Sequence, residues 1–392
     1  MSLINSSDEG SAKMDISKTD MIGCASPVLS QRALNRALLA RQLLLERSDM
    51  PVLQAVQHLV GLQAQAPNPP YVALWTRLQN FRHEELSQLI MDRSIVRIAL
   101  MRSTIHLVTA EDCLTLRPVL QSVQDRALKG TFGKKLAELD LDALAAAGRT
   151  LLEAQPLTFS ELGKRLQAQW PQCDATALSQ AVRCSLPLIQ VPPRGIWGAS
   201  GQAAHTTAEA WLGRPLGQGQ DPEAMLLRYL AAFGPASVKD MQVWSGLTRL
   251  REVIERLRPS LLSFRDEQGN ELFDLPDAPR PDPAAPAPPR FLSEFDNMLL
   301  SYDDRTRIMR DEDKHLVFTD NGIIRATLIV DGFVRGIWSI TQKRKSAILT
   351  INLFEPLSQA DHAEVSEEAV RLFDFNAPGT DSRDILFINQ KK

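Results

Sequence analysis

Cysteines, long apolar runs and an excess of basic charge are all missing or scarce in this sequence, and each absence excludes a class of protein. Four of the 392 residues are cysteine, and none lies in a Cys-x-x-Cys pair, so we expect neither a structural zinc site nor a disulfide framework. No stretch approaches the roughly 20 consecutive apolar residues of a membrane-spanning helix, and the N-terminus lacks the apolar core of a secretory signal. We therefore expect a cytoplasmic protein without a metal or other cofactor.

The charge balance argues against a protein that coats nucleic acid without regard to sequence. Such proteins carry a basic excess, whereas this chain has a formal net charge of −3 and a pI of about 6.1. A local basic face is compatible with these values if acidic surface elsewhere offsets it. Apolar residues make up 44% of the chain, and the length favours roughly two to four modules over one.

Helices followed by a short β segment recur along the chain. Residues 1–28 are rich in Ser, Asp and Lys without periodicity, and we expect them to be a disordered tail. Apolar residues then recur at helical spacing through four helices, one of them capped by Asn68, before residues 95–108 change to alternating β-branched positions. This order is typical of a winged helix, whose hairpin (the wing) directs basic residues at a phosphate backbone.

The same order occurs twice more, with Ser160 and Ser237 as expected helix caps. A Pro/Ala-rich linker follows, and the remaining chain shows β-type alternation with one late helix. The expected fold class is mainly α with β, with three tandem winged helices and a C-terminal β-barrel. The expected boundaries are 29–154 for the first winged helix with linking helices, 155–215 for the second, 216–275 for the third, 276–290 for the linker and 291–392 for the barrel-like domain.

One short segment resembles a known catalytic loop. Gly61-Leu62-Gln63-Ala64-Gln65-Ala66-Pro67 resembles the catalytic loop of the AlkZ-type DNA glycosylases, a branch of a winged-helix superfamily that also holds the AlkX (YcaQ-like) enzymes. Further segments over residues 34–344 look like hallmarks of the same family. They are Arg102-Ser-Thr-Ile-His106-Leu-Val, Phe233-Gly-Pro-Ala-Ser237 with Trp244-Ser-Gly-Leu247, Phe291-Leu292 with Phe295-Asp296-Asn297, and Val330-Asp-Gly-Phe-Val-Arg335-Gly.

The resemblance implies a C-shaped channel around DNA, formed by the three winged helices and the barrel. It also implies that Gln63 and Gln65 lie at the scissile nucleotide. In the AlkX branch the corresponding motif is Gln–hydrophobic–Asp, so the resemblance at Gln65 indicates the AlkZ branch. That branch is associated with removal of N7-alkylated purines, including interstrand crosslinks made by natural-product toxins. The implied partner is double-stranded DNA carrying such lesions, bound by a nucleoid-associated monomer.

The chemistry of glutamine agrees with that substrate class. Alkylation at N7 makes the purine cationic and therefore a good leaving group, so the enzyme need not protonate it. A glutamine amide has no useful pKa for general-base catalysis, but its oxygen can hold a water against the sugar. We expect a monofunctional hydrolase without a lyase step, because no lysine is implicated as a nucleophile.

Structural roles for these residues stay open. Gln63 and Gln65 could simply bond the backbone at a helix end. Arg102 and His106 would contact phosphate, or else form an ion pair and a half-buried polar group. Two C-terminal basic clusters could contact DNA or be ion-paired and solvated. They contain Arg305 and Arg307, and then Lys343 and Arg344.

Two other functions fit parts of this pattern. A non-enzymatic winged-helix regulator would bind an operator without releasing a base, although a dimerisation helix and an effector pocket are not evident. A broader AlkX-like glycosylase differs from this chain at Gln65.

Overall fold

The structure is a computed structural model that describes residues 26–219, 221–343 and 345–389. Nearly all of the expected tail, and the candidate DNA contact Arg344, lie outside these residues. Val28 was assigned to the tail, but it already belongs to a strand. That strand, β1 (Val28–Leu29), pairs in parallel with β8 (Leu262–Asp266). Regular structure therefore begins earlier than composition indicated.

Helices and one β-hairpin form the first part of the fold, as the periodicity predicted. Asn68 occupies the N-cap position of its helix, and two prolines follow in the first turn, but its side chain makes no capping hydrogen bond. The hairpin is antiparallel, with Val96 opposite Val108. The elements are α1 (Gln31–Arg41), α2 (Val52–His58), α3 (Pro69–Arg77), α4 (His83–Met91), β3 (Ile95–Ala99) and β4 (Ile105–Thr109).

The second part contains five helices, and the residue that caps the fourth of them differs from the one predicted. Thr158, not Ser160, caps α8: its hydroxyl accepts from the Glu161 backbone N–H at 3.2 Å, and the Glu161 carboxylate accepts from the Thr158 N–H at 2.9 Å. This reciprocal pair satisfies two free N–H groups, which a cap at Ser160 would not. The helices are α5 (Ala110–Val119), α6 (Gln121–Phe132), α7 (Leu141–Ala154), α8 (Phe159–Gln167) and α9 (Ala175–Ser185).

A six-stranded sheet joins the first two parts, which the sequence did not predict. Its order is β2-β4-β3-β6-β7-β5, and the contact between the two parts is the antiparallel pairing of β3 with β6, where Ile98 lies opposite Ile189. The β3–β4 and β6–β7 hairpins are therefore parts of one sheet. The added strands are β2 (Leu62–Gln63), β5 (Leu157–Thr158), β6 (Leu188–Gln190) and β7 (Ala204–Thr207).

The third part again places helices before a hairpin. Ser237 caps α12 as expected, since its hydroxyl accepts from the Asp240 N–H at 3.1 Å. The following Pro/Ala-rich stretch packs on α1, where Arg36 Nε donates to the Ala285 carbonyl at 2.7 Å. The elements are α10 (Ala208–Leu212), α11 (Glu223–Phe233), α12 (Val238–Ser245), α13 (Arg251–Leu257), β8 and β9 (Glu271–Asp274).

The expected C-terminal barrel is absent from the described residues, where the last sheet is open. Its strand order is β10-β11-β12-β13-β14, and β10 does not pair with β14. The physical reason is α16: it links β13 to β14 as a crossover, so these strands are parallel and the helix covers one sheet face. The elements are β10 (Arg290–Leu292), α14 (Asn297–Leu300), α15 (Lys314–Val317), β11 (Thr327–Val330), β12 (Phe333–Lys343), β13 (Ser346–Leu353), α16 (Gln359–Asn376) and β14 (Ser382–Asn389).

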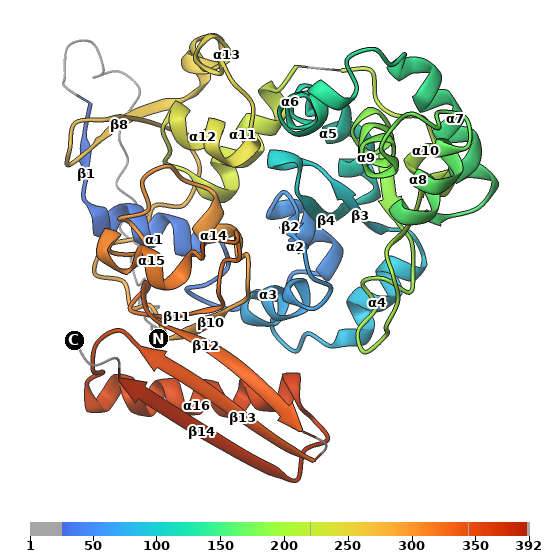
Figure 1. The fold of residues 1–392 in the computed structure, drawn as a ribbon. Helices are drawn as coiled ribbons and strands as arrows, with labels where there is room; N and C mark the ends of the chain where they lie inside the picture. The colour runs from blue at the N-terminus through green and yellow to red at the C-terminus, as the bar shows by residue number, and fades with distance from the viewer. Residues whose placement is uncertain (1–25, 220, 344, 390–392) are drawn as a thin grey trace, which may run out of the picture.

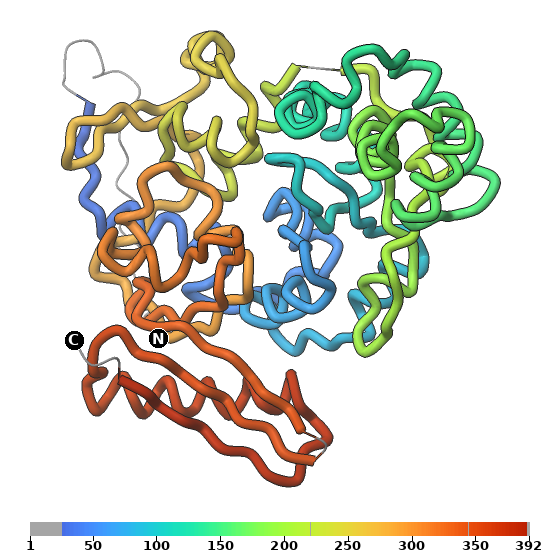
Figure 2. Tube along the Cα trace, viewed as in Figure 1, coloured from blue at the N-terminus to red at the C-terminus, as the bar shows by residue number. Residues whose placement is uncertain are grey.

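Segments far apart in the sequence are fastened by buried ion pairs. Arg41 of α1 pairs with Asp274 of β9 at 2.7 Å, and Arg77 of α3 pairs with Asp296 at 2.8 Å; all four side chains are fully buried. Figure 1 and Figure 2 show α1 beside the segment that contains α14 and α15, while β12, β13 and β14 form a layer with α16 at the edge of the molecule. No helix among the described residues is long and apolar enough to cross a membrane.

Candidate active site

The loop that carries Gln63 and Gln65 is an edge segment of the six-stranded sheet. Gln63 of β2 lies opposite His106 of β4, and the Ala64 N–H donates to the Ile105 carbonyl at 2.7 Å. Alternation along this extended segment turns the Ala64 side chain into the core, where it is fully buried, and turns both glutamines away from it. A small apolar residue between two polar ones is therefore what the sheet requires here.

Gly61 allows the chain to enter this loop. Its φ is +86°, which L-residues with a side chain rarely adopt, and a Cβ there would lie 2.5 Å from Cγ1 of Val108. The glycine therefore lets β2 approach β4 closely.

The two glutamine side chains differ in burial and in hydrogen bonding. The Gln63 side chain is 6% exposed, and its Oε1 accepts from Arg102 Nη2 at 2.6 Å and from Thr104 Oγ1 at 3.3 Å. These two bonds occupy both lone pairs of that oxygen. Gln65 is exposed, and its Oε1 accepts only a long bond of 3.4 Å from the Ile105 N–H among the described residues. Gln65 therefore keeps a free acceptor, while Gln63 offers only its amide N–H₂.

Arg102 lies in a strained turn at the tip of the β3–β4 hairpin. Its φ is +54° and that of Ser103 is +58°, a left-handed conformation that costs energy for residues other than glycine. Neighbouring elements hold the turn. Arg183 of α9 donates to the Ser103 carbonyl at 2.7 Å, and Arg102 Nη1 donates to the carbonyl of Trp244 in the last turn of α12. Segments from three parts of the chain therefore fix the direction of Arg102.

The Arg102 guanidinium stays cationic at neutral pH. Burial, followed by the nearby charge of Arg305, lowers the pKa of Arg102 to about 10. No carboxylate in the described ranges forms an ion pair with Arg102 or hydrogen-bonds to either glutamine. The site therefore holds an uncompensated positive charge against a neutral amide.

His106 has a structural position. Its side chain is 2% exposed, and Nδ1 lies 2.9 Å from the Thr104 carbonyl oxygen. Burial, followed by the charge of Arg102, lowers the pKa of His106 to about 3. A neutral, buried imidazole offers no surface to a phosphate, so the expected DNA contact at His106 does not agree with its burial.

The C-terminal basic residues also differ from one another. Arg307 is 6% exposed, donates to the Pro235 carbonyl at 2.7 Å and lies 4.3 Å from the ring centre of Tyr302, which is a packing role. Arg305 is half-buried, donates to the Leu299 carbonyl at 2.7 Å and lies close enough to Arg102 to lower its pKa. Lys343 is exposed at the end of β12. Sequence grouped Arg305, Arg307 and Lys343 together as candidate DNA contacts, whereas the fold gives the three side chains different surroundings.

Two contributors to the site were not singled out as site residues from sequence. Thr104 contacts the Gln63 amide oxygen, and Arg183 supports the turn before it. Thr104 lies inside a segment already marked by its resemblance, but nothing in the sequence pairs Arg183 with Ser103, because the two residues come from different parts of the chain.

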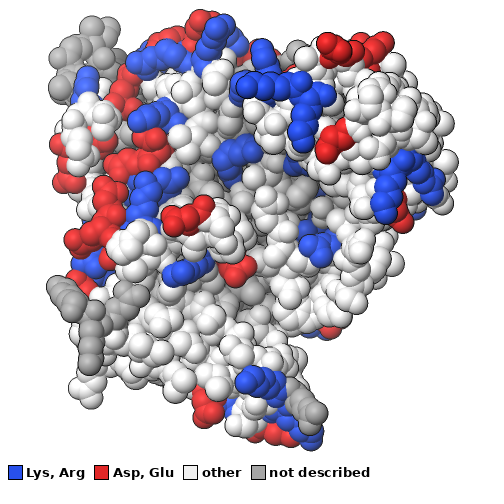
Figure 3. Space-filling model, in the orientation of Figure 1, with Lys and Arg blue, Asp and Glu red and all other residues white. Residues whose placement is uncertain are grey.

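Figure 3 shows Lys and Arg side chains near a central recess on the face seen in Figure 1.

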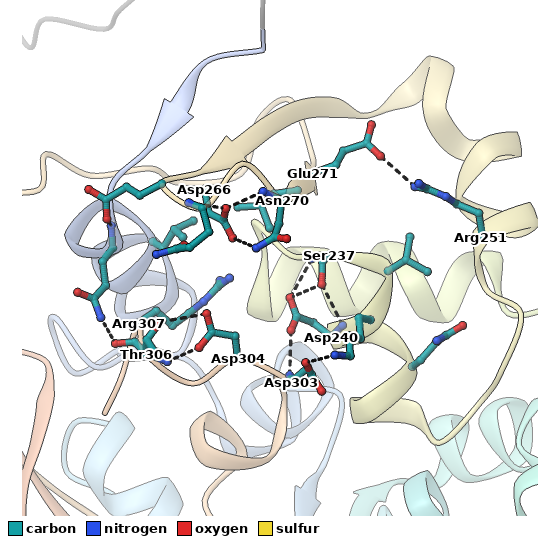
Figure 4. Close-up of a pocket in the computed structure, with 18 residues that line it drawn as sticks. Ser237, Asp240, Arg251, Asp266, Asn270, Glu271, Asp303, Asp304, Thr306 and Arg307 are labelled. Atoms are coloured by element: carbon teal, nitrogen blue, oxygen red, sulfur yellow. Dashed lines mark hydrogen bonds and ion pairs between the residues drawn. The ribbon is translucent and has the colours of Figure 1, made fainter. Parts of the chain in front are cut away.

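A cavity of about 570 Å³ lies elsewhere, between α12 and the β8–β9 hairpin (Figure 4). Acidic side chains outnumber basic ones in its lining, and two of these acids are paired: Asp303 with Lys239, and Glu271 with Arg251. The excess of acidic groups disfavours phosphate, so we do not place the DNA contact at this cavity.

Comparison with known proteins gives one family. The model of the family described as "DNA glycosylase AlkZ-like" matches residues 56–375. A curated relative from Streptomyces sahachiroi, "Interstrand DNA cross-link repair glycosylase", is 21% identical over 359 residues, which cover 85% of this chain and 92% of the relative. The solved structure of Streptomyces sahachiroi DNA glycosylase AlkZ has a TM-score of 0.77 at 20% identity and covers 92% of this chain and 100% of its own. The family model spans most of the chain, and we conclude that the protein belongs to the AlkZ-like DNA glycosylase family.

Proposed function

We propose that this protein hydrolyses the N-glycosidic bond of N7-alkylated purine nucleotides in double-stranded DNA, with a water held by Gln65. The observation that carries the proposal is the division between the glutamines. Gln63 Oε1 is occupied by Arg102 and Thr104, whereas Gln65 Oε1 has a free lone pair at an exposed position.

The reaction asks little of the enzyme at the base. An N7-alkylated purine leaves as a neutral molecule once the glycosidic bond breaks, and the sugar becomes an oxocarbenium-like cation. The Gln65 amide oxygen would hold a water toward that carbon, and its partial negative charge would favour the developing positive charge. The Gln63 amide, polarised by Arg102, would donate its N–H to a sugar or phosphate oxygen.

A neutral acceptor also sets the selectivity. Without a carboxylate to take the proton from water, the site would be slow on uncharged nucleotides, whose bases leave poorly. It would act on bonds already weakened by a positive charge on the base. No lysine of the described residues hydrogen-bonds to Gln63 or Gln65, so we propose an abasic site in an intact strand as the product.

The finer architecture belongs to the same proposal. Each of three segments places helices before a β-hairpin, which supports three winged-helix units around one DNA channel. The name of the Streptomyces relative supports interstrand crosslinks as one substrate, which would serve resistance to a toxin that forms them. Within this proposal Arg102, Arg305, Lys343 and Arg344 contact phosphates, while His106 and Arg307 have packing roles.

The test uses two DNA duplexes, one carrying N7-methylguanine and one carrying an N7-linked interstrand crosslink. The purified protein should release the methylated base and open the crosslink, and strand breaks should form only after alkali treatment. Gln65→Ala should lose most of the activity while binding the same duplex equally tightly. A wild-type protein that binds DNA without releasing either lesion would instead support a regulator.

A further inference from the structure

Arg97 of β3 lies directly behind the loop of the two glutamines. Its side chain is 1% exposed, and Nη2 donates to the carbonyl of Ala64 at 2.6 Å. Its Nε donates to Gln190 Oε1 of β6 at 3.1 Å. The carbonyl that Arg97 holds belongs to the peptide group between Ala64 and Gln65, so the contact fixes the plane from which the Gln65 side chain starts.

The Arg97 charge has no anionic partner. In the ranges that the structure describes, no carboxylate pairs with it, and Nη1 is buried without a hydrogen bond. Burial, followed by repulsion from Arg194, lowers the pKa of Arg97 to about 10, so it is still protonated at neutral pH. A buried, unpaired cation destabilises a fold relative to an apolar side chain of similar volume. Stability alone therefore does not account for an arginine here.

The surrounding segment is shaped to the Arg97 side chain. Gly195 has a φ of +98°, and a Cβ there would lie 2.6 Å from Cδ of Arg97. The Tyr71 hydroxyl of α3 donates to the Gly195 carbonyl at 2.8 Å and so anchors this glycine. Strand β6, the turn at Gly195 and helix α3 thus surround Arg97. On the side of the glutamine loop, its hydrogen-bond partner is the Ala64 carbonyl.

We infer that Arg97 is a positioning residue for the reaction, acting through the Ala64 carbonyl on the orientation of Gln65. The inference rests on the proposed function. It assigns Arg97 no contact with the substrate, because the side chain is closed off from solvent. Its effect is on the geometry of the water-holding amide, where a displacement of about 1 Å can cost on the order of 100-fold in rate.

The chain provides a matched control in Arg117 of α5. Arg117 is also buried, at 2% exposed, and its Nη2 donates to the Cys184 carbonyl at 2.8 Å. Burial lowers its pKa to about 10 as well. It makes no hydrogen bond to residues 61–67 among those described. Arg117→Met therefore removes the same kind of buried cation without affecting the loop.

The experiment measures single-turnover release of N7-methylguanine, DNA affinity and thermal stability for the wild type, Arg97→Met and Arg117→Met. We expect Arg97→Met to slow release by about 10-fold to 100-fold with unchanged DNA affinity, and Arg117→Met to leave the rate unchanged. Wild-type release tests the proposed function, whereas the ratio of variant to wild type tests this inference. An equal rate for Arg97→Met and wild type, or an equal loss in both variants, would overturn it.

A second measurement separates positioning from a general structural role. If Arg97 acts through Gln65, adding Arg97→Met to Gln65→Ala should cause little further loss, because the amide that it orients is already gone. Full additivity of the two losses would contradict the inference. If Arg97→Met does not fold, Arg97→Lys is measured instead; its ammonium keeps the charge but lacks the planar fork with which Arg97 reaches Ala64 and Gln190 from two different nitrogens. A slower rate at wild-type affinity supports positioning, and a wild-type rate overturns it.

Discussion

Arg102 donates a hydrogen bond of 2.6 Å to the amide oxygen of Gln63, and a strained turn holds the arginine in place. The bond joins an uncompensated cation to a neutral amide, so it is charge-assisted and stronger than a bond between neutral groups. It leaves the Gln63 N–H₂ group as the only part of that amide available to a substrate. The two glutamines of the loop therefore have different chemical roles.

Arg102→Met should reduce catalysis more than Thr104→Val. The first variant removes a charged donor to Gln63, whose loss costs about 1.5–3 kcal/mol, and the second removes a neutral donor, for about 0.5–1.5 kcal/mol. We expect rate losses of roughly 10-fold to 100-fold and below about 10-fold respectively. Single-turnover release of N7-methylguanine checks both. A larger loss in Thr104→Val would show that the Arg102 bond does not orient Gln63.

Gln65→Glu should extend activity to an uncharged lesion. A carboxylate at this exposed position can accept a proton from the bound water, and general-base catalysis contributes about 10²-fold to 10⁴-fold. Release of hypoxanthine from DNA is the measurement, and the wild type should release it far more slowly than Gln65→Glu does. The control is Gln63→Glu, whose carboxylate would pair with Arg102 and gain no such activity. Equal gain in both variants would place the water elsewhere.

The sequence predicted the loop and many element starts, but not the contacts around them. The order of helices and the hairpin at residues 95–108 follow from local periodicity. Asp331-Gly332, a residue pair common in tight hairpin turns, forms the turn between β11 and β12. The predicted barrel was wrong because α16 returns the chain so that β14 pairs in parallel with β13 and the sheet stays open. A helix on one sheet face and closure into a barrel are two ways to bury that face, and the choice between them depends on long-range contacts. Local patterns do not encode that choice.

The candidate site shows the same limit at the level of single residues. Gln63 and Gln65 were found because their spacing resembles a known loop. His106 lies on a strand where alternation cannot tell a buried face from an exposed one, because four of the five residues of β4 are buried and both of its faces are covered. Arg97 carried no local signal, because its partner Ala64 lies 33 positions away in sequence.

The buried histidines predict how stability depends on pH. Burial, followed by the charge of Arg102, lowers the pKa of His106 to about 3, and burial lowers that of His205 to about 4. Between the unfolded pKa of about 6.5 and these values, the unfolded chain binds more protons than the folded chain. The contribution of these two histidines to the free energy of unfolding is therefore fully present above about pH 6.5. It falls as the pH drops, by up to about 1.4 kcal/mol per pH unit for each histidine.

Urea unfolding at pH 7 and pH 5.5 measures this dependence. His106→Asn should reduce this dependence to the part that His205 contributes, because one titrating group is removed while an amide can still donate to the Thr104 carbonyl. A wild-type stability that rises between pH 7 and pH 5.5 would contradict the buried, neutral state of His106.

Lys343→Gln should weaken DNA binding and reduce its salt dependence. Lys343 is exposed at the end of β12 and forms no ion pair among the described residues, so it can neutralise one phosphate. Each neutralised phosphate contributes about 0.9 to the slope of log K against log salt concentration. The slope should fall by about that amount in Lys343→Gln. The matched control is Lys239→Gln, because Lys239 pairs with Asp303 at 2.7 Å in the acidic cavity. Titrations of one lesion-free duplex at several salt concentrations compare the two variants, and an equal change in both would mean that Lys343 contributes only to the overall charge.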